Sequence, residues 1–150
     1  MAEPFMIRVV IADDHYLVRQ AIRALLENAW GIEVVGEARD GQEVIQIVNE
    51  VNPDVVVMDI SMPEKDGIMA TSELQEQESP PRVVILSMYG GAELVERAVR
   101  NGALAYLLKR STAGELVQAV RSAVKGKLFV GSRILPIERE KQLRKLVHST

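Results

Sequence analysis

The chain has 150 residues, a net charge of −3 and no cysteine, with 47% hydrophobic and 26% charged residues. This length allows one domain with a sizeable core but not two ordinary ones, and the composition argues against a disordered chain. Without cysteine there can be no disulfide and no thiolate metal site. No apolar stretch approaches the ~20 residues of a membrane-spanning helix, and the net charge by itself makes no case for nucleic-acid binding.

Short aliphatic runs alternate along the chain with segments in which apolar residues recur at three- and four-residue spacing. The first helical segment carries Leu17, Ala21 and Leu25 on one face. In chain order we predict a strand near 6–12, a helix near 15–28, a strand near 32–37, a helix near 41–51, a strand near 54–59, a helix near 66–77, a strand near 82–87, a helix near 92–101, a strand near 104–108 and a helix near 112–125.

Five strands alternating with five helices require crossover connections, and therefore a mostly parallel sheet covered on both faces. Among doubly wound α/β folds, the flavodoxin-like (CheY-like) strand order 2-1-3-4-5 fits best. This order puts strands one and three side by side. Asp13 and Asp14 follow the first strand and Asp59 follows the third, so we expect the three carboxylates to be neighbours at the carboxyl edge of the sheet.

Clustered carboxylates repel one another, so the site should bind a hard divalent cation or shift its pKa values. We predict that Asp13 and Asp14 hold Mg²⁺ while Asp59 acts as a nucleophile toward phosphorus and forms an acyl phosphate. Ser87 closes the fourth strand and Lys109 follows the fifth, so both would face the same edge and contact phosphoryl oxygens. Taken singly, an aspartate could cap the first helix and Lys109 could be a surface residue, but their joint spacing favours the site.

The motifs around these residues occur in a definite order and spacing. They are Ile11-Ala12-Asp13-Asp14-His15, Val35-Gly36-Glu37-Ala38, Asp40-Gly41, the run from Pro53 to Pro63, Asp66-Gly67, Leu86-Ser87-Met88-Tyr89 and the run from Gly102 to Lys109. Over about residues 6–131 the chain resembles the receiver domain of two-component response regulators, most closely the NarL/FixJ (LuxR-type) subfamily.

The resemblance implies a role for the acidic residues and for their partners. Asp59 would be the phosphoacceptor, and Asp13, Asp14, Asp59 and the backbone carbonyl of Ser61 would bind Mg²⁺. The phosphoryl donor would be a phosphohistidine on a sensor histidine kinase. The protein would not otherwise be an enzyme, since only self-phosphorylation on Asp59 and autodephosphorylation are expected.

The resemblance also implies a switch and an output. Lys109 would contact the phosphoryl group, Ser87 would be the switch hydroxyl and Tyr106 the switch aromatic. The surface of the fourth helix, fifth strand and fifth helix would then control homodimerisation or an output domain, with transcription regulation as the function of the full-length protein. We expect a cytoplasmic protein, because the Met-Ala-Glu-Pro start lacks a secretion signal.

The last residues differ from the rest in charge. Residues 132–150 hold five basic and two acidic residues, a net +3, so the preceding 131 residues carry −6 of the total of −3. We therefore predict a receiver domain over 1–131 and a basic linker or short helix over 132–150. The alternative for 132–150 is the stub before a missing helix-turn-helix domain, because a DNA-binding module of that kind does not fit in this segment.

Two other classes of function compete with a phosphorylation switch. A Mg²⁺-dependent aspartyl-phosphate phosphohydrolase usually has Asp-x-Asp after its first strand, whereas Asp13 and Asp14 are adjacent and no proton donor is placed beside them. A flavin-binding domain shares the fold, but the acidic loop after the first strand would repel the cofactor's phosphate.

Overall fold

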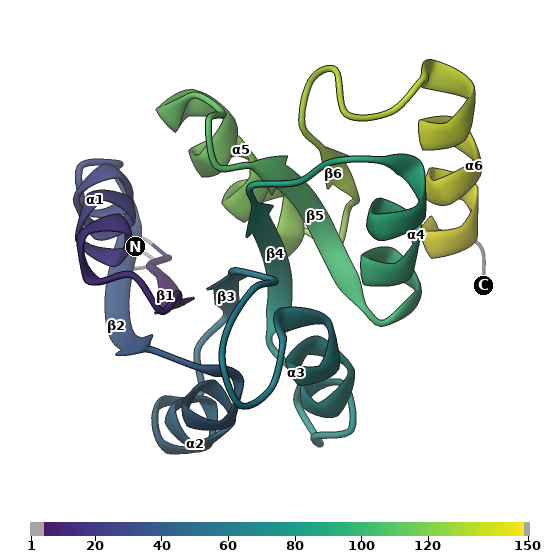
Figure 1. Cartoon of the computed structure of the whole chain (residues 1–150). Coiled ribbons are helices and arrows are strands. Elements are labelled where there is room, and N and C mark those ends of the chain that lie inside the picture. The colour runs from purple at the N-terminus through teal and green to yellow at the C-terminus, as the bar shows by residue number, and fades with distance from the viewer. Residues whose placement is uncertain (1–4, 149–150) are drawn as a thin grey trace.

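A computed structural model describes residues 5–148, in which helices cover both faces of one parallel sheet (Figure 1). The six strands lie in the order β2-β1-β3-β4-β5-β6. The elements are β1 (Ile7–Ala12), α1 (Tyr16–Glu27), β2 (Ile32–Ala38), α2 (Gly41–Val51), β3 (Val55–Met58), α3 (Gly67–Leu74), β4 (Arg82–Ser87), α4 (Ala92–Arg100), β5 (Ala103–Leu108), α5 (Ala113–Val124), β6 (Phe129–Val130) and α6 (Ile137–His148).

The predicted fold class and the strand order 2-1-3-4-5 are confirmed, and the sheet continues by one strand that was not predicted. β6 has two residues and pairs with β5 through Ala105 opposite Phe129 and Tyr106 opposite Val130. Two residues are too few to show a periodic pattern, so this strand forms only because β5 offers free backbone groups beside it. β5 is consequently an inner strand of the sheet.

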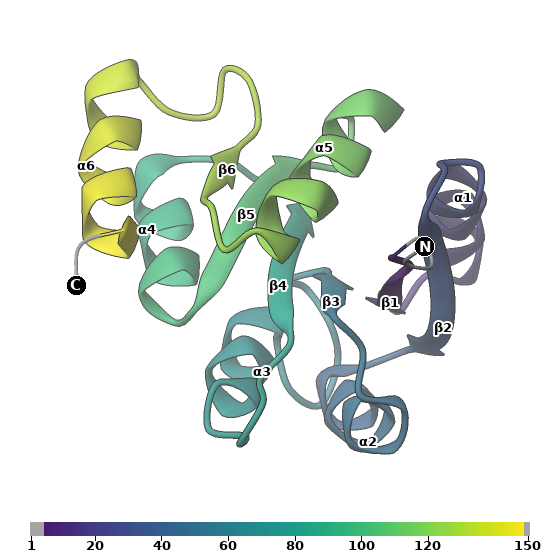
Figure 2. The same ribbon diagram turned by 180° about the vertical axis from the view of Figure 1, so that it is seen from behind.

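Alternate side chains of each strand enter two separate cores, as the two-residue period of a strand requires. In β1, Val9 and Ile11 pack with α1 and α5, whereas Val10 and Ala12 face the opposite side, where α2, α3 and α4 lie (Figures 1 and 2). All four residues are 0–1% exposed. No helix among residues 5–148 combines the length and the apolar character needed to cross a membrane.

The last residues were predicted as a basic linker or a short helix, and the structure has the helix α6 there, packed against α4. Leu143 is 4% exposed within the core that contains α4, and Arg139 forms an ion pair with Glu96 of α4. Arg144 donates a hydrogen bond of 2.7 Å to the carbonyl of Leu128, just before β6. Figure 1 shows α6 alongside α4.

The loop after β3 is held close to α3, which keeps the carboxyl edge of the sheet compact. Asp66 caps α3 by accepting a hydrogen bond from the Met69 N–H, and the Gly67 N–H donates to the Ile60 carbonyl at 2.8 Å. A Cβ atom on Gly67 would lie 2.1 Å from the carbonyl oxygen of Asp59. Only glycine allows this approach, because no side chain fits between the two backbones.

We expect Gly67→Ala to destabilise the protein by about 1–3 kcal/mol or more, the usual cost of forcing extra atoms into a packed site. Gly114→Ala is the matched control, because a Cβ there would meet only Thr112 Oγ1 at 3.9 Å. Alanine in α5 should leave stability unchanged or raise it by up to about 1 kcal/mol. Urea unfolding of both variants tests this, and equal stabilities would contradict the close approach at Gly67.

Candidate functional site

Two buried carboxylates and one lysine meet at the carboxyl edge of the sheet. Asp13 follows β1, Asp59 follows β3 and Lys109 follows β5, and the two aspartates are 1% and 4% exposed. Lys109 Nζ lies 2.7 Å from Asp13 Oδ2 and 3.2 Å from Asp59 Oδ2. One ammonium group therefore neutralises part of the charge of both carboxylates. The sequence predicted that the three residues share this edge of the sheet, but not that Lys109 would pair with the carboxylates.

Backbone hydrogen bonds beyond the strand ends hold these three residues in place. The Asp13 N–H donates to the Ala38 carbonyl at 3.0 Å, and the Asp59 N–H donates to the Ala12 carbonyl at 2.9 Å. The Lys109 N–H donates to the Ser87 carbonyl at 2.8 Å. The sheet thus fixes the main chain of the site, and the side chains start from rigid positions.

The charges at the site shift the pKa values of Asp59 and Lys109. Burial raises the pKa of Asp59 and the nearby Asp13 carboxylate adds to this, whereas Lys109 opposes them, and the net pKa is raised. Burial by itself would lower the pKa of Lys109, but the attraction of Asp13 and Asp59 outweighs it and the net pKa is raised. Lys109 therefore stays charged, while the anionic form of Asp59 is disfavoured.

Asp14 and His15 extend the acidic group toward solvent. His15 Nδ1 lies 3.0 Å from Asp14 Oδ1 and 3.4 Å from Asp13 Oδ1, and both Asp14 and His15 are exposed. One potential ligand atom from each of Asp13, Asp14 and His15 lies within 4.8 Å of the others. Asp59 is not a member of this group, since it meets Asp13 through Lys109.

The capping interpretation of the acidic pair is wrong. His15 is the N-cap residue of α1, and its side chain accepts no capping hydrogen bond. Asp13 Oδ1 instead accepts a hydrogen bond of 2.9 Å from the His15 N–H, before the helix begins. Asp13 Oδ1 is thus bonded to the N-cap residue itself, and Asp13 Oδ2 faces Lys109.

Ser61 lies in the loop after β3, and Ser87 is the last residue of the neighbouring strand β4. The Ser61 N–H donates to Asp59 Oδ1 at 3.2 Å, which holds the β3–α3 loop against the carboxylate. Ser87 is 1% exposed, and its hydroxyl accepts a hydrogen bond of 3.1 Å from the Tyr89 N–H. The Ser87 hydroxyl can still donate its own hydrogen.

Tyr106 points into the protein from β5 and is 0% exposed. Its hydroxyl donates a hydrogen bond to the carbonyl of Tyr89, in the loop between β4 and α4. Burial raises the pKa of Tyr106, and the Ser87 hydroxyl beside it has the opposite, smaller effect. Sequence analysis missed the part played by Tyr89, because a backbone acceptor can be supplied by any residue type.

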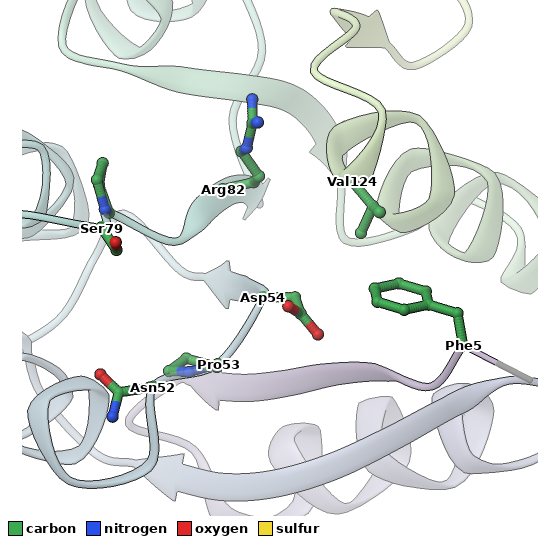
Figure 3. A pocket seen from close by; sticks show the side chains of 8 residues that line it. Phe5, Asn52, Pro53, Asp54, Ser79, Arg82 and Val124 are labelled. Carbon is green, nitrogen blue, oxygen red and sulfur yellow. The ribbon is translucent and has the colours of Figure 1, made fainter. Parts of the chain in front are cut away.

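Of two pockets in the structure, one lies away from this site and the other borders it. One of about 540 Å³ is lined by residues such as Phe5, Asp54 and Arg82, and Figure 3 shows their side chains around it. Asp54 precedes β3, so this pocket opens at the amino edge of the sheet, opposite Asp59. A second, of about 290 Å³, lies between α1 and α5 and has Lys109 in its lining.

The fold and the site together define a class of protein. A doubly wound parallel sheet that gathers buried aspartates and a lysine at its carboxyl edge is the architecture of CheY-like receiver domains, and known proteins bear this out. The response regulator receiver domain family matches residues 9–121. The chain belongs to this family, among regulators of the NarL/FixJ (LuxR) type.

Three relatives show how far the similarity extends. The transcriptional regulatory protein LiaR of Bacillus subtilis is 40% identical over 144 residues, which are 96% of this chain and 66% of LiaR. The signal receiver domain of NarL from Mycobacterium tuberculosis superposes with a TM-score of 0.79 at 36% identity, covering 83% of this chain and 100% of that one. A LuxR-family response regulator from Aurantimonas sp. SI85-9A1 has a TM-score of 0.85 at 33% identity, covering 92% and 99%.

The chain is shorter than the curated regulators that it matches. It spans 66% of LiaR and 59% of the oxygen regulatory protein NreC of Staphylococcus haemolyticus. These relatives are named as regulators, and the similarity gives no support to the phosphohydrolase alternative. What they share with this chain is the receiver domain.

We expect Asp59→Asn to stabilise the protein at pH 7 by about 1 kcal/mol, because burial disfavours the anionic form of Asp59 more than Lys109 favours it. The raised pKa means that folding favours protonated Asp59, so the charged form costs stability above the raised pKa. The gain should vanish as the pH falls below the ordinary value of 3.8, where Asp59 is protonated in both states. Urea unfolding without divalent cations, from pH 3 to pH 7, measures it, and a net loss at pH 7 would contradict the unfavourable charge.

Proposed function

We propose that Asp59 accepts a phosphoryl group from a phosphohistidine on a sensor histidine kinase. The observation that carries this proposal is the Lys109 ammonium, which lies 2.7 Å from Asp13 and 3.2 Å from Asp59. A phosphoryl group on Asp59 would form beside a cation that is already in position. Phosphoryl transfer asks little of a protein beyond such positioning and charge neutralisation.

The bond changes of the proposed step balance without another reactant. A carboxylate oxygen of Asp59 attacks phosphorus, the P–N bond of the phosphohistidine breaks, and the imidazole nitrogen leaves with the electron pair of that bond. The product is an acyl phosphate on Asp59. Attack by water later returns the carboxylate and inorganic phosphate, which is the autodephosphorylation that we propose as the only other chemistry.

The residues at the site fit Mg²⁺, and we propose it as the cofactor. Asp13 Oδ2 is buried, and no donor among residues 5–148 gives it a hydrogen bond of favourable geometry. The Lys109 ammonium lies 2.7 Å away as an ion-pair partner. Carboxylate oxygens are ligands that Mg²⁺ prefers, so Asp13, Asp14 and Asp59 would hold it, with the Ser61 carbonyl as a further ligand. When bound, the ion would neutralise charge that develops on the phosphoryl oxygens.

Ser87 and Tyr106 would couple the phosphoryl group to the surface. The Ser87 hydroxyl already accepts from the Tyr89 N–H and would donate its hydrogen to a phosphoryl oxygen. Tyr106, bonded to the Tyr89 carbonyl, occupies the space beneath the same loop. Phosphorylation would then favour one arrangement of the β4–α4 loop and of the α4-β5-α5 surface, to the extent of its differential interaction with the two states.

The output of the proposed switch is regulation of transcription. LiaR is named as a transcriptional regulatory protein, and we propose the same activity for the full-length protein to which this domain belongs. The α4-β5-α5 surface would control homodimerisation or an output domain, and DNA would be bound only through a helix-turn-helix domain. We place this signalling in the cytoplasm, where sensor kinases present their phosphohistidine.

We expect acetyl phosphate with Mg²⁺ to label the wild-type protein once, and Asp59→Asn to remain unlabelled. Intact-mass spectrometry and phosphate-affinity electrophoresis measure the label. Asp54→Asn is the matched control, because Asp54 lies at the other end of β3 and its carboxylate accepts a hydrogen bond from the Arg8 N–H. Equal labelling of Asp59→Asn and the wild type would show that Asp59 is not the acceptor.

A further inference from the structure

The Arg19 guanidinium is buried behind the loop that carries Asp13 and Asp14. Arg19 of α1 is 8% exposed, and its NH1 donates a buried hydrogen bond of 2.8 Å to the backbone carbonyl of Asp13. Its Nε donates to Glu37 Oε1 at 3.0 Å. Burying a guanidinium is costly unless its donors are paired, so both acceptors are needed to keep Arg19 in this place.

Glu37 anchors Arg19 from the neighbouring strand β2. Its carboxylate also accepts hydrogen bonds from Gln20 at 2.8 Å and from Arg23 at 2.6 Å. Burial by itself would raise the pKa of Glu37, but the hydrogen bonds from Arg23 and Arg19 outweigh it and the pKa is lowered. Glu37 is therefore a firmly ionised anchor that ties α1 to the end of β2.

The hydrogen bond from Arg19 is accepted by the carbonyl of the peptide group that joins Asp13 to Asp14. The Asp13 N–H is held by the Ala38 carbonyl and the Asp13 carbonyl is held by Arg19, so the main chain is fixed on both sides. Asp13 Oδ1 is held by the His15 N–H. The main chain at Asp13, from which the acidic pair projects, is therefore fixed.

We propose that Arg19 is a positioning residue for the cation site, holding the Asp13–Asp14 peptide so that the two carboxylates converge on one ion. The proposal rests on the function proposed above, since it concerns the same Mg²⁺ site. Arg19 does not touch the ion or the phosphoryl group and acts only through the Asp13 carbonyl. Partners of this kind typically change metal affinity by ten- to a hundredfold when they are removed.

Isothermal titration of the purified protein with MgCl₂ tests the proposal. We expect Arg19→Met to weaken Mg²⁺ binding at least tenfold, because methionine fills the same space but leaves the Asp13 carbonyl without its donor. Arg23→Met is the matched control, because Arg23 shares the Glu37 carboxylate but has no hydrogen bond to Asp13. Its affinity should stay within twofold of the wild type.

Loss of stability is separated from loss of positioning by a second control. Val48→Ala removes buried volume in α2, where Val48 is 2% exposed, and should lower the melting temperature without changing Mg²⁺ affinity. Arg19→Lys keeps the charge but lacks the planar fork that reaches Glu37 and the Asp13 carbonyl together, so we expect at least threefold weaker binding. This variant carries the test if Arg19→Met does not fold.

The outcomes separate the positioning role from the site itself. Weaker binding by the Arg19 variants, with Arg23→Met and Val48→Ala unchanged, supports the proposal. Wild-type affinity in the Arg19 variants, or an equal loss in Arg23→Met, overturns the positioning role and leaves the Mg²⁺ site standing. Failure of the wild-type protein to bind Mg²⁺ overturns the cation site, and the role of Arg19 with it.

Discussion

The contact on which the site depends is the one between the Lys109 ammonium and two buried carboxylates. Without Lys109, Asp13 and Asp59 would be two buried like charges with no cation between them, and leaving buried charges uncompensated in this way costs about 3–5 kcal/mol. The balance is incomplete, because the pKa of Asp59 is still raised. A divalent cation beside the two carboxylates would relieve the remaining unfavourable charge.

The parallel sheet makes this arrangement possible. Asp13, Asp59, Ser87 and Lys109 come from four different strand ends, and every strand of a parallel sheet ends at the same edge. Hydrogen bonds that continue past the strands then fix the main chain at each position. The sheet therefore fixes the main chain of the site at each of these positions.

A second ion pair, between Arg19 and Glu37, contacts the main chain of the site. Arg19 donates one hydrogen bond to the Asp13 carbonyl and another to Glu37, and so links the main chain of the site to β2. Elsewhere in the molecule, β6 extends the sheet beyond β5, and α6 packs against α4. The basic tail therefore packs onto the receiver fold. The proposed α4-β5-α5 output surface thus borders residues that follow the predicted end of the receiver domain.

The sequence alone predicted the fold class, the strand order and the edge shared by Asp13, Asp59 and Lys109, because aliphatic runs with polar ends alternate with helical segments and so require crossover connections in a parallel sheet. It did not reveal β6, which has too few residues to show a period. It also did not reveal that Arg19 turns inward to the Asp13 carbonyl, or that Tyr106 bonds to the Tyr89 carbonyl. Those contacts were decided by tertiary structure, since a donor can choose among many acceptors until packing brings one backbone carbonyl within reach.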